Sequence, residues 1–154
     1  MLRPGDRAPE FTLPDQDGRD VSLSTLLGQH MLILYFYPAD FTPGCTREAC
    51  AIRDLHEEMR GNGLIVAGVS PQSPESHHAF REKYSLRYPL LSDCDKNVAR
   101  MYDVNGPLGF GLRRATFLID QSRHIRDAVL ADFRISLHEA FTRRAVALRA
   151  SNSR

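Results

Sequence analysis

The chain has 154 residues, of which 42% are hydrophobic and 25% are charged, and its formal net charge is +1. This length is typical of one domain with its own hydrophobic core, and the composition excludes a disordered or fibrous chain. The nearly balanced charge gives no electrostatic reason to expect a nucleic acid or an anionic membrane as a partner.

Two further features of the sequence indicate the cellular compartment of the protein. The most continuous apolar run, residues 31–37, is far shorter than the roughly 20 residues of a transmembrane helix, and the first ten residues lack the apolar segment of a secretory signal. We therefore expect a cytoplasmic protein with no membrane partner. Three cysteines are too few, and odd in number, for a disulfide scaffold, so the question is whether one of them is reactive.

In chain order, the first thirty residues predict a short hairpin, because the turn residues 15–18 separate the apolar segments 11–13 and 20–23. Strands and helices then alternate. The predicted strands cover residues 31–37, 64–69, 89–91 and 115–119, with 125–130 as the hairpin partner of the last. The predicted helices cover residues 45–60, 73–84, 96–102 and 135–149, and residues 105–111 form a loop.

Strands that alternate with helices favour an α/β fold whose sheet has helices on both faces. The final strand pair adds an antiparallel direction, so we expect a central mixed sheet. No repeat or linker divides the chain, and residues 1–154 are expected to form a single domain. A thioredoxin-like arrangement fits this pattern, although periodicity alone does not select it among α/β folds.

The segment with the clearest chemistry runs from Tyr37 to Cys50. Pro43 and Gly44 form a turn after a buried strand, which places Cys45 in the first turn of a helix. Unpaired N–H groups and the positive end of the helix dipole favour a thiolate there. An isolated cysteine is more often a small buried apolar residue. A position at the carboxyl end of a strand, where α/β folds build their sites, favours a reactive cysteine instead.

The pattern Pro38-x-x-x-Thr42-x-x-Cys45 resembles the active-site signature of the peroxiredoxins, which are thiol peroxidases with a thioredoxin-like fold. A second cysteine five positions later, Cys50, resembles the Q-type, or bacterioferritin-comigratory-protein-like, subgroup. Residues 5–13, 91–96 and 114–120 also resemble segments of that family, whereas the chain departs more from it after Arg123. The resemblance implies a mixed sheet flanked by helices, with the hairpin as an N-terminal extension.

The resemblance also implies roles for five residues. Cys45 would attack hydrogen peroxide or an organic hydroperoxide and become a sulfenic acid. Thr42 would hydrogen-bond the thiolate and the peroxide, Pro38 would shield the pocket from water, and Arg114 would stabilise negative charge. Cys50 would form a disulfide with Cys45, and a thioredoxin- or glutaredoxin-type protein would reduce it.

Each role has an ordinary structural alternative. Thr42 and Pro38 could be turn residues, and Cys50 a buried helix residue. Arg113 and Arg114 could be a solvated pair. The resemblance selects Arg114, because the arginine of the family lies two residues before a Ser/Thr-Phe pair, as Arg114 does before Thr116 and Phe117. On a strand, Arg114 would share a face with Thr116.

Four other features are expected to be passive. Glu48 lies in the motif, but its charge could serve only the first turn of the helix. Cys94 lies between two aspartates and does not match the expected resolving position. His77 and His78 are expected to be exposed. No histidine has a metal-ligand spacing with the cysteines, so we expect no metal and no cofactor.

For the oligomeric state, we expect a monomer, with a dimer as the alternative.

Two other functions stay open at this stage. A thioredoxin-like disulfide oxidoreductase would normally need Cys-x-x-Cys, whereas four residues separate Cys45 from Cys50. A redox sensor or holdase-type protein would use Cys45 without turnover. Peroxide turnover, disulfide reduction and the oxidation rate of Cys45 would discriminate among the three.

Overall fold

A computed structural model describes residues 1–106, 111–130, 141 and 143–147. Its larger sheet has five strands in the order β5-β4-β3-β6-β7. The strands are β3 (Met31–Phe36), β4 (Leu64–Ser70), β5 (Leu90–Ser92), β6 (Ala115–Ile119) and β7 (Ile125–Leu130). β3, β4 and β5 are parallel, whereas β6 is antiparallel to both β3 and β7. The predicted mixed sheet and terminal hairpin are therefore confirmed.

The N-terminal hairpin is also confirmed. β1 (Thr12–Pro14) and β2 (Asp20–Ser22) pair antiparallel as a separate two-stranded sheet. A short helix that the sequence analysis missed, α1 (Leu23–Leu27), follows at once, and the side chain of its N-cap Ser22 accepts a hydrogen bond from the Thr25 amide. Five residues are too few for the helical periodicity to show in the sequence.

Three further helices lie where the sequence predicted helices. These helices are α2 (Pro43–Gly61), α3 (Pro74–Tyr84) and α4 (Asn97–Met101). Ser73 caps α3 by accepting from the Ser76 amide. The Asp93 carboxylate accepts hydrogen bonds from the amides of Val98 and Ala99 in α4.

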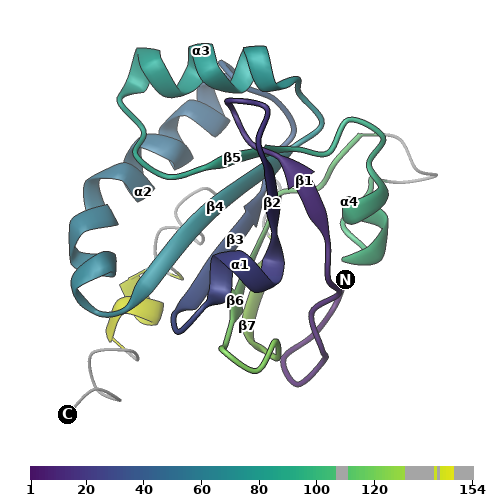
Figure 1. Ribbon diagram of the computed structural model, residues 1–154, viewed down its shortest axis with the longest axis vertical. Coiled ribbons are helices and arrows are strands. Elements are labelled where there is room, and N and C mark those ends of the chain that lie inside the picture. Colours follow the sequence, from purple (N-terminus) through teal and green to yellow (C-terminus); the bar gives the residue numbers. More distant parts are fainter. Residues whose placement is uncertain (107–110, 131–140, 142, 148–154) are drawn as a thin grey trace.

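The sheet separates two halves of the core, and strand alternation assigns each side chain to one of them. Leu32, Leu34 and Phe36 face the half that includes the hairpin, α1 and α4. Ile33 and Tyr35 face the half that includes α2 and α3. Figure 1 shows the hairpin and α1 on one side of the sheet and α2 on the other.

One glycine in the sheet leaves room for the side chain of a neighbouring tyrosine. A Cβ on Gly68 of β4 would lie 2.9 Å from the Cζ atom of Tyr35. The Tyr35 ring occupies that space, and its hydroxyl lies 3.0 Å from the hydroxyl of Tyr88. The Tyr88 hydroxyl in turn donates to the carbonyl of Ala49 in α2, at 3.0 Å. This chain of contacts fastens the middle of α2 to the sheet.

The predicted C-terminal helix over 135–149 lies mostly outside the described residues. Phe141 and residues 143–147 are helical, and Phe141 is fully buried in the core half that includes α2. Leu137 and Leu148, expected on the same face, lie outside the description, as do residues 107–110 of the predicted loop.

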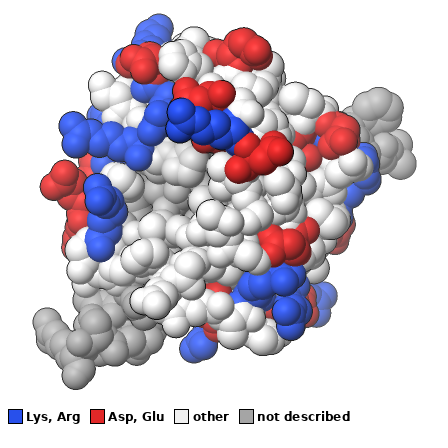
Figure 2. Space-filling model, in the orientation of Figure 1, with Lys and Arg blue, Asp and Glu red and all other residues white. Residues whose placement is uncertain are grey.

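The charged side chains are mixed on the surface. On the face shown in Figure 2, acidic and basic groups alternate without one large patch of a single sign, in keeping with the net charge of +1. Among the described residues, the longest helix is too polar to cross a membrane.

Candidate active site

The loop between β3 and α2 places Cys45 at a helix start. β3 ends at Phe36, a turn follows, and Thr42 in extended conformation is the N-cap of α2, with Pro43 in the first turn. Proline suits this position because its missing N–H is one that the helix leaves unpaired anyway. Cys45 therefore lies in the first turn, and it is 1% exposed. A negative charge on its sulfur would meet the positive end of the helix dipole in surroundings that exclude water.

Arg114 lies beside this helix start although it is 69 residues further along the chain. β6 pairs with β3 so that Ala115 lies opposite Phe36, which brings Arg114 to the end of β3 where the loop begins. The Arg114 Nη2 group donates to the Cys45 Sγ atom at 3.1 Å. The sequence expectation that Arg114 shares a face with Thr116 is consistent with this contact, because that face is the one covered by α2.

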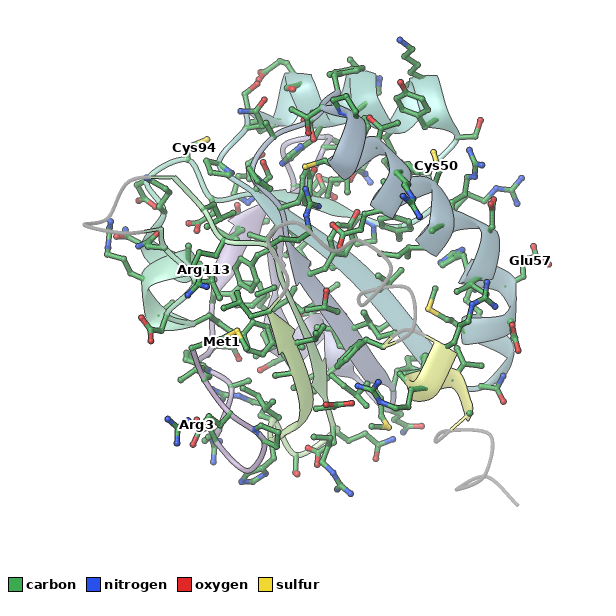
Figure 3. The ribbon with its side chains drawn as sticks, turned by 180° about the vertical axis from the view of Figure 1, so that it is seen from behind. Met1, Arg3, Cys50, Glu57, Cys94 and Arg113 are labelled. Atoms are coloured by element: carbon green, nitrogen blue, oxygen red, sulfur yellow. The ribbon has the colours of Figure 1, made fainter. Side chains whose placement is uncertain are left out.

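Arg113 points elsewhere. It is exposed, whereas Arg114 is 6% exposed, and its amide donates to the Val104 carbonyl just after α4. Figure 3 shows Arg113 on the side of the molecule where α4 lies. Of the two adjacent arginines, the structure therefore brings Arg114 to Cys45.

Glu48 holds the other end of the guanidinium. Arg114 Nη1 donates to Glu48 Oε1 at 2.6 Å, and both side chains are buried. Cys45 and Glu48 are three residues apart and so lie on one helix face. Burial alone would lower the pKa of Arg114, but the negative charges of Glu48 and Cys45 raise it above its ordinary value. The guanidinium is therefore charged where it meets the sulfur.

The expectation for Glu48 was wrong in one respect. The first turn of α2 contains no acidic residue, and Glu48 lies beyond it. The Glu48 carboxylate faces Arg114 instead. The spacing between Cys45 and Glu48 could have shown that both lie on one face, but only the sheet pairing shows that Arg114 lies there too.

Thr42 and Pro38 lie on the exposed side of the loop. The Thr42 hydroxyl donates to the Ala39 carbonyl at 3.1 Å. Donation to a thiolate or a peroxide, as the family resemblance implies, would require this hydroxyl to rotate. Pro38 is exposed and therefore lies outside the core.

The three cysteines are free. Cys50 is partly buried one turn further along α2. In a regular helix, Cα atoms five residues apart are about 8.6 Å apart, and their side chains point about 140° away from each other. A disulfide needs Cα atoms within about 7 Å, so the helix must open before Cys45 and Cys50 can bond.

Cys94 lies apart from both. It is exposed after β5, and its Sγ group donates to the Gln72 carbonyl at 3.8 Å. Figure 3 shows Cys94 and Cys50 on opposite sides of that view.

The expectation of exposure was wrong for His77. Its side chain is completely buried, with Nδ1 2.7 Å from the Oδ2 atom of Asp40, whereas the side chain of His78 is about half exposed. The signal was present in the sequence, because His77 lies three residues before the buried Phe80 and therefore on the core face of α3. Asp40, inside the motif, was not recognised either. Across the part of the chain described here, three or more His, Cys, Asp or Glu side chains never gather as a metal site would need.

Comparisons with known proteins fit this geometry. Residues 4–128 match the AhpC/TSA family. Peroxiredoxin Bcp of Escherichia coli K12 is 43% identical over 143 residues, which cover 89% of this chain and 90% of that protein. A putative peroxiredoxin of Coxiella burnetii is 45% identical over 123 residues, covering 76% and 81%.

Solved structures are similar over almost the whole chain. Peroxidoxin BcpB from Mycobacterium tuberculosis is 36% identical with a TM-score of 0.89, and the match covers 98% of each chain. Peroxiredoxin Q from Xanthomonas campestris is 29% identical with a TM-score of 0.84, over 97% of each chain. The bacterioferritin comigratory protein of the same organism has alkyl peroxide reduction activity.

Proposed function

Because the chain belongs to the AhpC/TSA family and is a thiol peroxidase, we propose that Cys45 is the residue that attacks the peroxide. The contact between Arg114 Nη2 and Cys45 Sγ, at 3.1 Å, carries this proposal. A guanidinium beside a sulfur at a helix start is an arrangement that favours a thiolate, and the thiolate is the nucleophilic form of cysteine.

The first step would proceed as follows. The Cys45 sulfur attacks one oxygen of the hydroperoxide, a sulfur–oxygen bond forms and the oxygen–oxygen bond breaks. Sulfur becomes a sulfenic acid, and the other oxygen leaves as an anion that takes up a proton to give water or an alcohol. Arg114 would stabilise the charge on the leaving oxygen, and Glu48, which accepts from its Nη1 group, would keep the guanidinium in that orientation. Thr42 would hydrogen-bond the peroxide after its hydroxyl turns from Ala39, and Pro38 would limit the entry of water.

The second step would use Cys50. Its thiol attacks the sulfenic sulfur, water leaves, and a disulfide joins Cys45 to Cys50. Peroxide chemistry of this kind needs a thiol reductant to restore both thiols. We propose that the reductant is a dithiol protein of the thioredoxin or glutaredoxin type, acting on a monomer in the cytoplasm.

Donor-coupled peroxide consumption tests the proposal. The wild type should turn over hydrogen peroxide with thioredoxin as donor, Cys45→Ser should be inactive, and the matched control Cys94→Ser should behave like the wild type. Activity in Cys45→Ser would contradict the assignment. Cys50→Ser should still consume the first equivalent of peroxide and then stop, because the sulfenic acid forms without its partner.

A further inference from the structure

A buried cluster, which the peroxidase chemistry above does not use, joins the loop before α2 to α3 and β5. The Asp40 carboxylate accepts from the hydroxyl of Tyr37 at 2.6 Å and from the hydroxyl of Ser76 in α3 at 2.8 Å. The Nδ1 atom of His77 lies 2.7 Å from the same carboxylate. The other ring nitrogen, Nε2, lies 3.1 Å from the Leu91 carbonyl of β5. The side chains of Asp40 and His77 are fully buried.

The donors and acceptors around Asp40 and His77 require a proton between the Asp40 carboxylate and the Nδ1 atom of His77. A carbonyl oxygen only accepts, so Nε2 of His77 must carry a hydrogen. In a neutral ring, Nδ1 would then present a lone pair to the Asp40 oxygen, and two acceptors 2.7 Å apart would repel. The contact therefore contains a proton. Since both oxygens of Asp40 already accept, one from Tyr37 and one from Ser76, we assign the proton of this contact to Nδ1 of His77.

Tyr37 remains a donor in this cluster. Burial and then the charge of Asp40 hold the pKa of the Tyr37 hydroxyl well above its ordinary value, and the charge of Cys45 acts in the same direction. Tyr37 is thus a titratable group in direct contact with the pair, and Tyr88 and Cys45 act on Tyr37 in turn. The contacts from α3 and β5 are the Ser76 hydroxyl and the Leu91 carbonyl, which carry no charge.

The loop that the pair holds has a strained backbone. Phe41 has a φ of 65°, a left-handed conformation that costs a residue with a side chain on the order of 1–2 kcal/mol. Such a conformation persists where neighbouring contacts determine it. The carboxylate of the preceding residue, Asp40, takes part in three hydrogen bonds, and the following residue, Thr42, is the N-cap of α2.

We propose that Asp40 and His77 are positioning residues for the peroxide reaction. As a buried carboxylate–imidazolium pair, they fasten the loop of residues 37–42 to α3 and β5. They thereby hold Thr42 and the start of α2 in register with Arg114, which arrives from β6. This inference rests on the proposed role of Cys45, and the two residues act through the loop rather than on the sulfur.

One substitution separates the geometry of the pair from its charge. In Asp40→Asn, the amide oxygen can accept from Tyr37, while the two amide hydrogens can go to Nδ1 of a neutral His77 and to the Ser76 oxygen. Every contact keeps a donor and an acceptor, and the extra proton is lost. Asp40→Ala and His77→Ala remove the fastening altogether, and His78→Ala is the matched control, because its side chain is about half exposed on the same helix.

Two rates on the same sulfur give the readout. Peroxide needs the alignment of Thr42, Cys45 and Arg114, whereas alkylation by iodoacetamide needs only an accessible thiolate. Asp40→Ala and His77→Ala should lower the rate constant with hydrogen peroxide by on the order of 10- to 100-fold, the cost of misplacing a reacting group by about 1 Å. Their alkylation rates should fall much less. Asp40→Asn should keep most of the peroxide rate, and His78→Ala all of it.

Nitrogen NMR of His77 provides a second measurement. Both ring nitrogens should be protonated in the wild type, and Nδ1 should be unprotonated in Asp40→Asn. An unprotonated Nδ1 in the wild type would overturn the pairing. A peroxide rate in Asp40→Asn as low as in Asp40→Ala would show that charge rather than position matters, and would overturn the positioning role.

The controls distinguish this inference from the proposed function. Activity in Cys45→Ser would contradict the function itself. If that variant is inactive and His77→Ala reacts with peroxide like the wild type, only the positioning role is wrong. If the alanine variants do not fold, Ser76→Ala removes one donor to Asp40 and should lower the ratio of peroxide to alkylation rates, and an unchanged ratio would overturn the inference.

Discussion

Replacing Arg114 by alanine tests the electrostatic core of the site. The variant removes a buried cation that lies 3.1 Å from the Cys45 sulfur, so the thiolate and the leaving oxygen both lose the positive charge of the guanidinium. Two unit charges at that separation attract by ~5 kcal/mol at an effective dielectric constant of ~20. Part of this is offset by desolvation, and the loss of one such donor typically costs roughly 2–4 kcal/mol of transition-state stabilisation. The peroxide step should therefore slow by about 30- to 900-fold.

Stopped-flow measurement of Cys45 oxidation gives the rate directly. The variant should also be less stable, because the buried carboxylate of Glu48 loses its ion pair with Arg114, and breaking a buried ion pair from one side costs roughly 3–5 kcal/mol. The double variant Arg114→Ala/Glu48→Gln also removes the buried negative charge at position 48. It should recover stability but not the peroxide rate, which separates folding from catalysis.

Arg113→Ala is the matched control, because it removes an exposed cation one residue away. It should react like the wild type. The reasoning is refuted if Arg113→Ala is the slower variant, or if Arg114→Ala stays within a few-fold of the wild type while folded.

Three further outcomes are expected. On oxidation to the intrahelical disulfide that includes Cys50, amides of residues 46–53 should lose hydrogen-exchange protection while β3 keeps its own, and equal protection in both redox states would contradict the need for α2 to open. Cys94→Ser should leave turnover unchanged, and peptide mapping that finds Cys94 in the catalytic disulfide would contradict this. Gly68→Ala should lower the free energy of unfolding by roughly 1–3 kcal/mol, because the new Cβ would lie 2.9 Å from the Tyr35 ring, and an unchanged urea midpoint would show that the ring can move away.

Local patterns in the sequence were sufficient for most of the secondary structure. Alternation of apolar residues and the turn residues around them predicted β6 over 115–119 and β7 over 125–130, and the structure has the same bounds. The Pro-Gly pair likewise located the start of α2 to within two residues, because the helix was expected from Cys45 and begins at Pro43. Helix starts depend on residues that are neighbours in the chain. The resemblance to the peroxiredoxins rested on the same short segment.

What meets Cys45 was decided by the tertiary structure. Arg114 lies 69 residues away, and strand alternation showed its face but not which helix covers that face. Glu48 was interpreted as a helix-dipole charge until the pairing of β6 with β3 placed a guanidinium beside it. His77 was expected in solvent, although its spacing from Phe80 places both on one face of α3, and the tertiary structure supplied the partners of that face, Asp40 and the Leu91 carbonyl. Contacts between distant residues depend on strand order and on the rotation of each helix about its axis, and a single sequence specifies both only through the packing of the whole core.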